Sequence, residues 1–190
     1  MPRAGLSATA VTSAAVDLID EQGPSALTLT AVAERSGVSA PSLYKHVRNL
    51  AELRDRVAGY VFEEFNERLT KAILGRAGQE ALRAIMIAYR QYVLEYPHRY
   101  AMLPQSPSAD PVLDAAGQRL LEVAMAVLRG YGLTGAEAIR AARCLRAVAH
   151  GFASLESVGA FGLPEDLDST YEQLIDILSV GFVKVIPATA

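Results

Sequence analysis

The chain has no tryptophan, a single cysteine and no long uninterrupted hydrophobic run among its 190 residues. One cysteine, Cys144, excludes an intramolecular disulfide framework and fits a reducing compartment. No apolar run approaches the roughly 18 residues that a membrane-spanning helix needs. The small-residue stretch 4–16 is too poor in leucine, and too soon followed by acids, for a secretory signal. We therefore expect a cytoplasmic protein that does not enter a membrane.

Catalytic motifs are also missing. The three histidines and the cysteine have no metal-ligand spacing, and the chain has neither a glycine-rich phosphate loop nor a nucleophile elbow. Its clustered carboxylates, such as Glu63 and Glu64, are interpreted as solvated helix faces. Cys144 lies among alanine and leucine, which favours inert packing over a thiol sensor. We predict that the protein is not an enzyme and needs no metal or cofactor.

What the sequence does contain is apolar and helix-forming. Half of the residues are hydrophobic, which is enough to build a packed core in one domain or two small ones. The formal net charge of −3 argues against an extensive basic surface, but it leaves room for a small basic face. An all-α fold is the expected class.

Apolar residues recur at helical spacing along most of the chain, between recognisable caps and breakers. Ser7, Thr28, Ser39 and Asn49 are predicted N-caps of the first four helices, and Gly23-Pro24 ends the first of them. Further helices are expected at about 79–95, 112–129, 135–157 and from Asp168 onward. The proline-rich stretch 97–111 predicts a loop with at most one short helix.

The strongest local signal is the segment TLTAVAERSGVSAPSLYKHVRN, residues 28–49. Two short helices flank a tight turn at Gly37, where glycine accommodates the left-handed backbone. From Arg35 through Ala51 the charged residues are Arg35, Lys45 and Arg48, and no acidic residue occurs in this segment. This pattern is typical of a helix-turn-helix that contacts DNA. Helix spacing alone would equally allow a helical hairpin in a core.

The residue identities resemble the DNA-binding domain of the TetR family of transcriptional regulators, above all in GVSAPSLYKHVRN. The resemblance covers about the first 65 residues. It implies a helix-turn-helix and binding, as a homodimer, to double-stranded DNA with a pseudo-palindromic operator. The contacts that it implies come from Thr28, Thr30, Ser39, Ala40, Pro41, Ser42, Tyr44, Lys45, His46 and Arg48.

Two of these positions carry qualifications. Many family members have lysine where this chain has Leu50, so Arg48 is expected to supply the phosphate contact that the leucine cannot make. His46 is alternatively a partly buried histidine that bonds within the domain.

The C-terminal half resembles a TetR subgroup that contains a His-Gly pair, through the segment RAVAHGFASLE at 146–156. Gly151 in mid-helix predicts a close approach of another helix. Apolar stripes on the last two helices suggest dimerisation, and the resemblance implies a four-helix bundle with a second subunit. The expected interface comprises Gly151, Phe152, Leu155, Tyr171, Leu174, Ile175, Leu178 and Phe182. Alternatively, these stripes pack on their own subunit.

A ligand pocket is expected where aromatic and methionine side chains gather at helical spacing. The candidate residues are Met86, Tyr89, Tyr92, Tyr96, Met125 and His150. Such stripes are more often core than pocket, so the core interpretation remains open.

We thus predict a helix-turn-helix domain at 1–48, a connecting helix at 49–75 and a ligand-binding and dimerisation domain at 76–190. The predicted function is a transcriptional regulator, a repressor that a small, largely apolar effector releases from its operator. The alternative is a helical small-molecule-binding protein or enzyme with no DNA role. The sequence does not distinguish a repressor from an activator.

Overall fold

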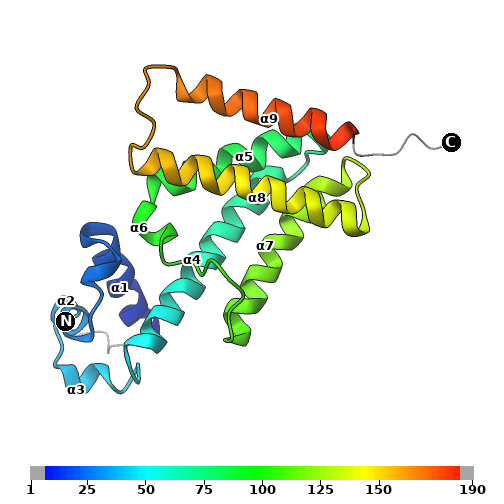
Figure 1. Ribbon diagram of the computed structural model, residues 1–190. Helices are drawn as coiled ribbons and strands as arrows, with labels where there is room; N and C mark the ends of the chain where they lie inside the picture. Colours follow the sequence, from blue (N-terminus) through cyan, green and yellow to red (C-terminus); the bar gives the residue numbers. More distant parts are fainter. Residues whose placement is uncertain (1–6, 185–190) are drawn as a thin grey trace. The chain divides into compact units, whose positions relative to one another are not determined.

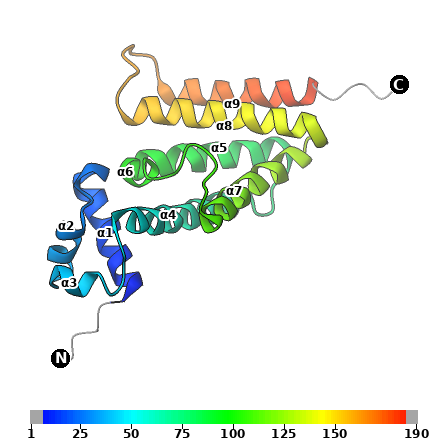
Figure 2. The ribbon, with the colours of Figure 1, turned by 60° about the horizontal axis from the view of Figure 1, so that its bottom comes forward.

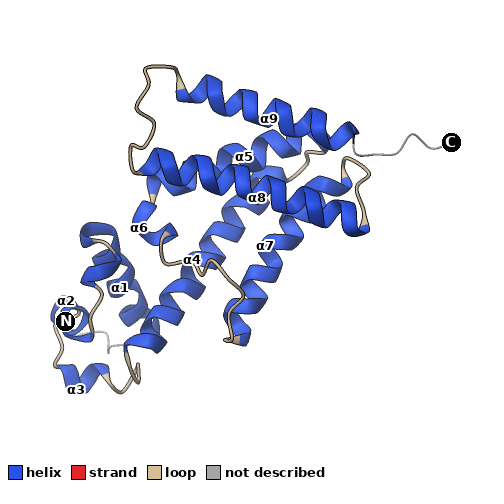
Figure 3. Ribbon diagram, viewed as in Figure 1, coloured by secondary structure: helices blue, strands red, loops and turns tan. Residues whose placement is uncertain are grey.

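The computed structural model describes residues 7–184, and all regular structure within that range is helical (Figures 1 and 3). The expected all-α class is confirmed. The helices of the N-terminal part are α1 (Ala8–Gln22), the short 3-10 helix η1 (Pro24–Ala26), α2 (Leu29–Arg35), α3 (Ala40–Leu43) and α4 (Leu50–Ile73). They are followed by α5 (Gly78–Glu95), α6 (Pro97–Tyr100), α7 (Pro111–Arg129), α8 (Gly135–Ser157) and α9 (Leu167–Lys184). Within residues 7–184, no helix is both long and apolar enough to cross a membrane.

The chain divides into two compact units that are discontinuous in sequence. Unit 1 contains residues 1–64 and 98–116, and unit 2 contains residues 65–97 and 117–190. The division therefore falls inside α4 and α7, and the segment 98–116 belongs with the N-terminal helices. Boundaries drawn along the sequence alone give no sign of that association.

Three helix starts follow from capping residues that the sequence predicts, whereas the predicted cap Ser39 precedes α3 without a side-chain capping hydrogen bond. The Ser7 hydroxyl accepts a hydrogen bond from Ala10 N–H, and the Thr28 hydroxyl accepts one from Ala31 N–H, both at 3.1 Å. Asn49 Oδ1 accepts from Glu52 N–H at 2.8 Å at the start of α4. Each bond satisfies a backbone donor that has no partner within the helix.

The last helix begins slightly earlier than predicted. The side chain of Asp166, not of Asp168, accepts the Ser169 N–H at 2.7 Å and caps α9. Thr134 is the N-cap of α8 by backbone conformation, but its side chain makes no capping hydrogen bond.

The core of unit 1 forms where α1, α2 and the N-terminal half of α4 meet. Val11, Ile19, Val32, Leu53 and Val57 are almost completely buried, and their spacing along each helix is the 3.6-residue periodicity of an amphipathic face. This core holds the short α3 in place through Leu43, which is 1% exposed.

In unit 2, α5 packs against both α8 and α9, and α8 and α9 lie side by side (Figure 2). Aromatic rings fill the space between these helices: Phe152 of α8 lies 4.9 Å from Tyr171 of α9, centroid to centroid. The Tyr171 hydroxyl donates to the backbone oxygen of Met86 in α5 at 2.8 Å. The bond satisfies a buried phenol, so α9 is held to α5 by a polar contact within an apolar interior.

Candidate nucleic-acid interface and ligand-binding residues

The turn between α2 and α3 has the geometry that the sequence predicts. Gly37 has a φ of 65°, in the left-handed region that favours glycine. The next residue, Val38, donates its N–H to the Ala33 oxygen at 3.0 Å and so closes the end of α2. α3 is shorter than expected, because the chain continues after Leu43 in tight turns to Val47. The region from 28 to 49 is therefore a helix-turn-helix with a short second helix.

The ten side chains predicted to contact DNA all lie outside the core of unit 1. Ser42 and His46 are half-buried, and the other eight are exposed: Thr28, Thr30, Ser39, Ala40, Pro41, Tyr44, Lys45 and Arg48. Tyr44 is an apolar ring with 55% of its surface exposed. The Ser39 and Ser42 hydroxyls lie 3.1 Å apart, so each can present a donor or an acceptor to a neighbouring group.

Electrostatically, this surface is more balanced than its sequence suggests. Arg48 donates to Glu52 through Nε at 2.9 Å and through its backbone N–H at 2.8 Å. These bonds, together with one from Arg56, lower the pKa of Glu52 to about 2, so its carboxylate is charged at neutral pH. Arg35 forms a two-point pair with Glu21 of α1, with its Nη1 at 2.7 Å from Oε2. The segment 35–51 contains no acidic residue, but acids from outside it lie close to it in the folded protein. Two of its three cations, Arg35 and Arg48, are therefore ion-paired.

The tyrosines predicted to line a pocket gather around a ring that the sequence analysis did not single out. Phe65 of α4 lies 5.0 Å from Tyr89 and 4.8 Å from Tyr92, and Tyr92 lies 5.4 Å from Tyr96. Tyr92 is 0% exposed, whereas Tyr89 and Tyr96 are half-buried. Phe65 belongs to the same helical stripe as the α4 core residues, and its spacing gave no distinct signal.

The other three pocket candidates have different environments. Met86 is 1% exposed and lies in the core beside Tyr171. Met125 of α7 and His150 of α8 are half-buried. Desolvation, and secondarily the positive charge of Arg146, lower the pKa of His150, so its imidazole is neutral at pH 7. Its Nδ1 lies 3.4 Å from the Ser154 hydroxyl one turn later.

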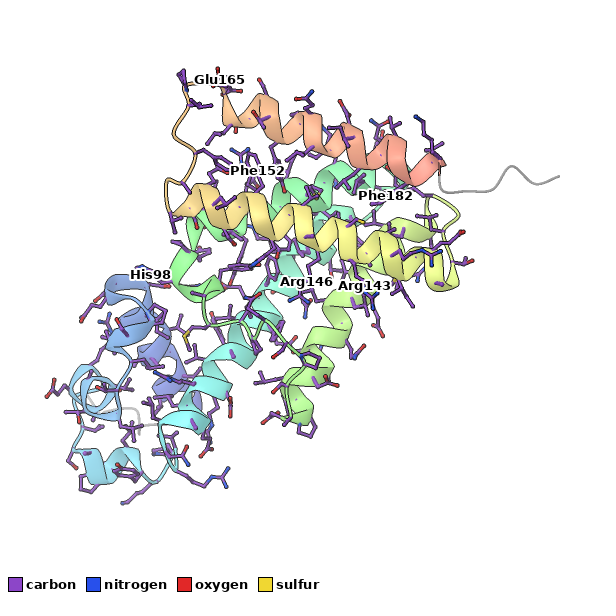
Figure 4. The ribbon with its side chains drawn as sticks, in the orientation of Figure 1. His98, Arg143, Arg146, Phe152, Glu165 and Phe182 are labelled. Carbon is purple, nitrogen blue, oxygen red and sulfur yellow. The ribbon has the colours of Figure 1, made fainter. Side chains whose placement is uncertain are left out.

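Most of the side chains predicted to form a dimer interface are already covered by their own chain. Phe152, Tyr171, Ile175, Leu178 and Phe182 are all at most 9% exposed, and Figure 4 shows Phe152 and Phe182 between α8 and α9. Their apolar surface is largely covered within this chain, and their contact with a second subunit stays a prediction at these five positions. An apolar stripe along a helix indicates that this face is buried, but it does not indicate whether the same chain or a second subunit covers it. Only Gly151 and Leu174, both half-buried, and Leu155, 48% exposed, remain accessible.

The outward faces of α8 and α9 carry a different set of apolar and small residues. Ile139 and Leu155 of α8, and Ile177 and Val180 of α9, are 46–59% exposed. A Cβ added at Gly151 would meet no atom within 4 Å, so no helix in the described part of this chain makes the close approach expected there. Cys144 is exposed rather than packed, which corrects the interpretation that it is inert packing.

Metal-ligating side chains do not converge anywhere in the part of the chain that the structure describes: no group of three or more His, Cys, Asp or Glu residues could hold an ion there.

Comparisons with known protein families match both ends of the chain. Residues 11–57 match the family model described as "Bacterial regulatory proteins, tetR family". Residues 82–178 match the model described as "Tetracyclin repressor-like, C-terminal domain". The first match spans the helix-turn-helix, and the second spans α5 to most of α9.

Individual proteins agree with these matches. An uncharacterized helix-turn-helix-type transcriptional regulator of Mycobacterium tuberculosis is 33% identical over 183 residues, which is 95% of this chain and 84% of the relative. A Rhodococcus protein of unknown function has the same fold, with a TM-score of 0.83, 21% identity and coverage of 95% and 98% of the two chains. A TetR variant of Acinetobacter baumannii, solved in complex with minocycline, has a TM-score of 0.72, 23% identity and coverage of 95% and 98%.

Proposed function

Because this chain belongs to the TetR family of DNA-binding transcriptional regulators, we propose that it is a homodimeric repressor that a small, largely apolar effector releases from its operator. The observation that carries the proposal is that none of the ten expected DNA-contacting side chains is buried and that eight of them are exposed on one helix-turn-helix, above a core that buries its apolar residues. An enzyme or carrier has no need of such a surface.

The proposed division of labour at this surface follows from side-chain chemistry. Lys45 and Arg48 bind phosphates, because a cation on an exposed side chain replaces condensed counterions without reading the sequence. Ser39, Ala40 and Ser42 lie at the start of α3, where a recognition helix meets base edges, and the Ala40 methyl suits a thymine methyl. Thr28, Thr30, Pro41, Tyr44 and His46 surround this centre and contact the backbone or adjacent bases.

The dimer proposed here uses the outward faces of α8 and α9. Exposed Ile139, Leu155, Ile177 and Val180 supply apolar surface, while Gly151 and Gly181 leave room for close helix contact. Exposed apolar side chains on neighbouring helices are unfavourable in water, and a patch formed by them is typical of an interaction site. Binding to successive major grooves requires that such a dimer present its two recognition helices about 34–36 Å apart.

The proposed effector binds in unit 2 near the half-buried side chains of Tyr89, Tyr96, Met125 and His150. Aromatic and thioether groups supply apolar walls, and the hydroxyls with the neutral imidazole supply orienting hydrogen bonds. Met86 and Tyr92 are buried in the core of unit 2, where the Tyr92 ring contacts that of Tyr96. The Acinetobacter fold neighbour was solved in complex with minocycline, which supports a small-molecule ligand for this chain.

Gel shifts on the chain's own promoter, combined with sedimentation analysis, test this function. We expect a dimer that binds one pseudo-palindromic fragment tightly. Lys45→Ala and Arg48→Ala should weaken binding to all sequences about equally, and each should reduce the salt slope by about 0.9. Ser42→Ala and Ala40→Gln should instead change which bases are preferred. A stable monomer that ignores every promoter fragment, or phosphate variants with the wild-type salt slope, would refute the proposal.

A further inference from the structure

Arg99 of α6 joins three helices of unit 1. Its Nε lies 2.8 and 2.9 Å from the two carboxylate oxygens of Asp20, near the end of α1. Its Nη1 lies 2.8 and 3.0 Å from the two oxygens of Glu64 in α4. The Arg99 side chain is only 14% exposed, and each carboxylate is 29% exposed. The guanidinium thus makes a two-point contact with Asp20 through Nε and Nη2, and it contacts both oxygens of Glu64 through Nη1. The two acids are 44 residues apart in sequence.

The neighbouring residue adds a second contact to the same end of α1. His98 Nδ1 lies 3.2 Å from the backbone oxygen of Asp20. Its ring packs against Gly23, where an added Cβ would lie 3.7 Å from Nε2. Figure 4 shows His98 beside the C-terminal end of α1. Two residues of α6 therefore contact Asp20 in the last turn of α1. Arg99 binds its carboxylate, and His98 contacts its backbone oxygen.

These contacts are suited to fixing an angle between helices. A planar guanidinium that makes parallel hydrogen bonds to a carboxylate restricts orientation as well as distance. The two carboxylates raise the pKa of Arg99, so its charge is permanent. Without the arginine, the negative charges of Asp20 and Glu64 would face a partly desolvated site with no cation between them. The arrangement therefore favours one relative placement of α1 and α4.

α1 and α4 are the two helices that bracket the DNA-contacting segment. α1 leads through Gly23 and η1 to the Thr28 cap of α2, and α4 starts at Leu50, directly after Arg48. We infer that Arg99 is a positioning residue for DNA binding, which fixes α1 against α4 and so sets the presentation of α2 and α3. This inference rests on the proposed DNA-binding function. It also gives the segment 98–116 a role in DNA binding, because Arg99 of this segment positions the helices of unit 1.

Variants of the full-length protein test the inference. Arg99→Gln should raise the operator Kd by about 10-fold or more, because recognition needs side chains held within about 0.5 Å. Arg99→Lys keeps the charge but not the two-point geometry, so its Kd should lie between those of wild type and Arg99→Gln. Nonspecific DNA affinity and the salt slope should stay unchanged, since Arg99 touches no phosphate. The control is Arg83→Gln, which breaks an interhelical pair with Glu172 in unit 2 and should bind operator normally.

Stoichiometric titration separates positioning from simple loss of folding. Unfolding would lower the fraction of protein that binds DNA but leave the Kd of that fraction unchanged, whereas mispositioning raises the Kd at full active fraction. The combination Asp20→Asn with Glu64→Gln and Arg99→Met removes all three charges and should reproduce the Kd change with little loss of stability. A wild-type operator Kd in Arg99→Gln, or a loss only of active fraction, would overturn the inference.

Hydrogen exchange distinguishes failure of the inference from failure of the proposed function. If wild-type protein binds no promoter DNA, the proposed function is wrong. The clamp, which is Arg99 with Asp20 and Glu64, is then tested by the hydrogen-exchange rates of the backbone amides of residues 18–23. Faster exchange there in Arg99→Gln, but not in Arg83→Gln, supports a clamp on α1. Unchanged exchange overturns it.

Discussion

At the scale of single residues, Glu52 is the group that most changes how the DNA-contacting surface behaves. It accepts the Arg48 backbone N–H and the Arg48 and Arg56 side chains, and it lies in the first turn of α4. Negative charge in that turn stabilises the helix start. In the proposed DNA complex the same carboxylate would compete with DNA phosphate for Arg48, and phosphate affinity would be lower in return for a well-formed start of α4.

Glu52→Gln should therefore strengthen binding to DNA of any sequence by about 3- to 10-fold and steepen the salt slope by up to about 0.9. Glutamine keeps an oxygen for the Arg48 N–H but no longer neutralises the guanidinium. Fluorescence anisotropy against random duplexes at several salt concentrations measures both effects. The control is Glu67→Gln, which breaks the exposed pair with Lys71 in α4. Equal slopes for wild type and Glu52→Gln would show that Arg48 is not a phosphate contact.

Acid should remove the stabilising effect of Glu52 with a defined sign. Its pKa is about 2 in the folded protein against 4.5 for an ordinary glutamate. A depressed carboxyl pKa stabilises the folded state above about pH 4.5, and the effect is lost as pH falls toward about 2. The difference in thermal stability between wild type and Glu52→Gln should be constant from pH 8 to about 5 and shrink below that. A difference that grows on acidification would contradict the assignment.

At the scale of helices, α8 separates two faces with different partners. Its inner face meets α5 and α9, where Arg90 of α5 bonds to Glu156 through two nitrogens at 2.6 Å and pairs with Asp168 at the start of α9. The Arg90 guanidinium also lies over the rings of Phe152 and Tyr171. These contacts set the placement of α8 against α9 within one subunit. The outward face is the one that we propose for contact with a second subunit.

Gly151→Leu should leave the folded subunit stable but weaken the proposed dimer, and these two effects distinguish the inner from the outward face of α8. A leucine side chain meets no atom of its own chain at the Cβ position, and it favours the helix over glycine by about 0.8 kcal/mol. The subunit should therefore stay folded, while the proposed dimer is overpacked by about 1–3 kcal/mol. Sedimentation equilibrium and thermal unfolding measure the two quantities. Gly117→Leu in α7, where an added Cβ also meets nothing, should leave the dimer intact; an unchanged dimer in Gly151→Leu would place the interface elsewhere.

At the scale of the whole molecule, the proposed repressor must link events in two units that share α4 and α7. The α4 helix starts directly after the recognition segment and its C-terminal third, 65–73, belongs to unit 2. An effector acts on DNA affinity only by binding the two functional states with different affinities. α4 is the proposed element through which that difference is transmitted.

Changes at Tyr89 and His150 should alter the response to an effector while leaving DNA affinity without effector nearly intact. A thermal-shift screen of small apolar compounds on wild-type protein supplies the probe, and operator release then compares wild type with Tyr89→Ala, Tyr89→Phe and His150→Ala. Tyr89→Phe should show whether the hydroxyl orients the ligand. Binding should not change between pH 7 and 8, because the lowered pKa keeps His150 neutral. If the variants lost both folding and DNA binding, Tyr89 and His150 would be core residues and not ligand contacts.

The amino-acid sequence by itself determined the features of this protein that depend on local chemistry. The left-handed turn at Gly37 and the caps at Ser7, Thr28 and Asn49 are properties of a few adjacent residues, because backbone groups at a helix end find partners within one turn. The helix-turn-helix and the all-α class followed from these signals and from 3.6-residue periodicity. None of the ten candidates for DNA contact is buried, and eight of them are exposed, as these local signals predict.

Only the tertiary structure decided which partners lie far apart in sequence. Periodicity predicted the stripe of Tyr171, Ile175 and Phe182, but packing against α5 and α8 made it core rather than an outward face. The acid that pairs with Arg35 comes from α1, and the two acids that bind Arg99 come from α1 and α4. An ion pair is set by distance in space, and a charge pattern along the chain carries no such distance.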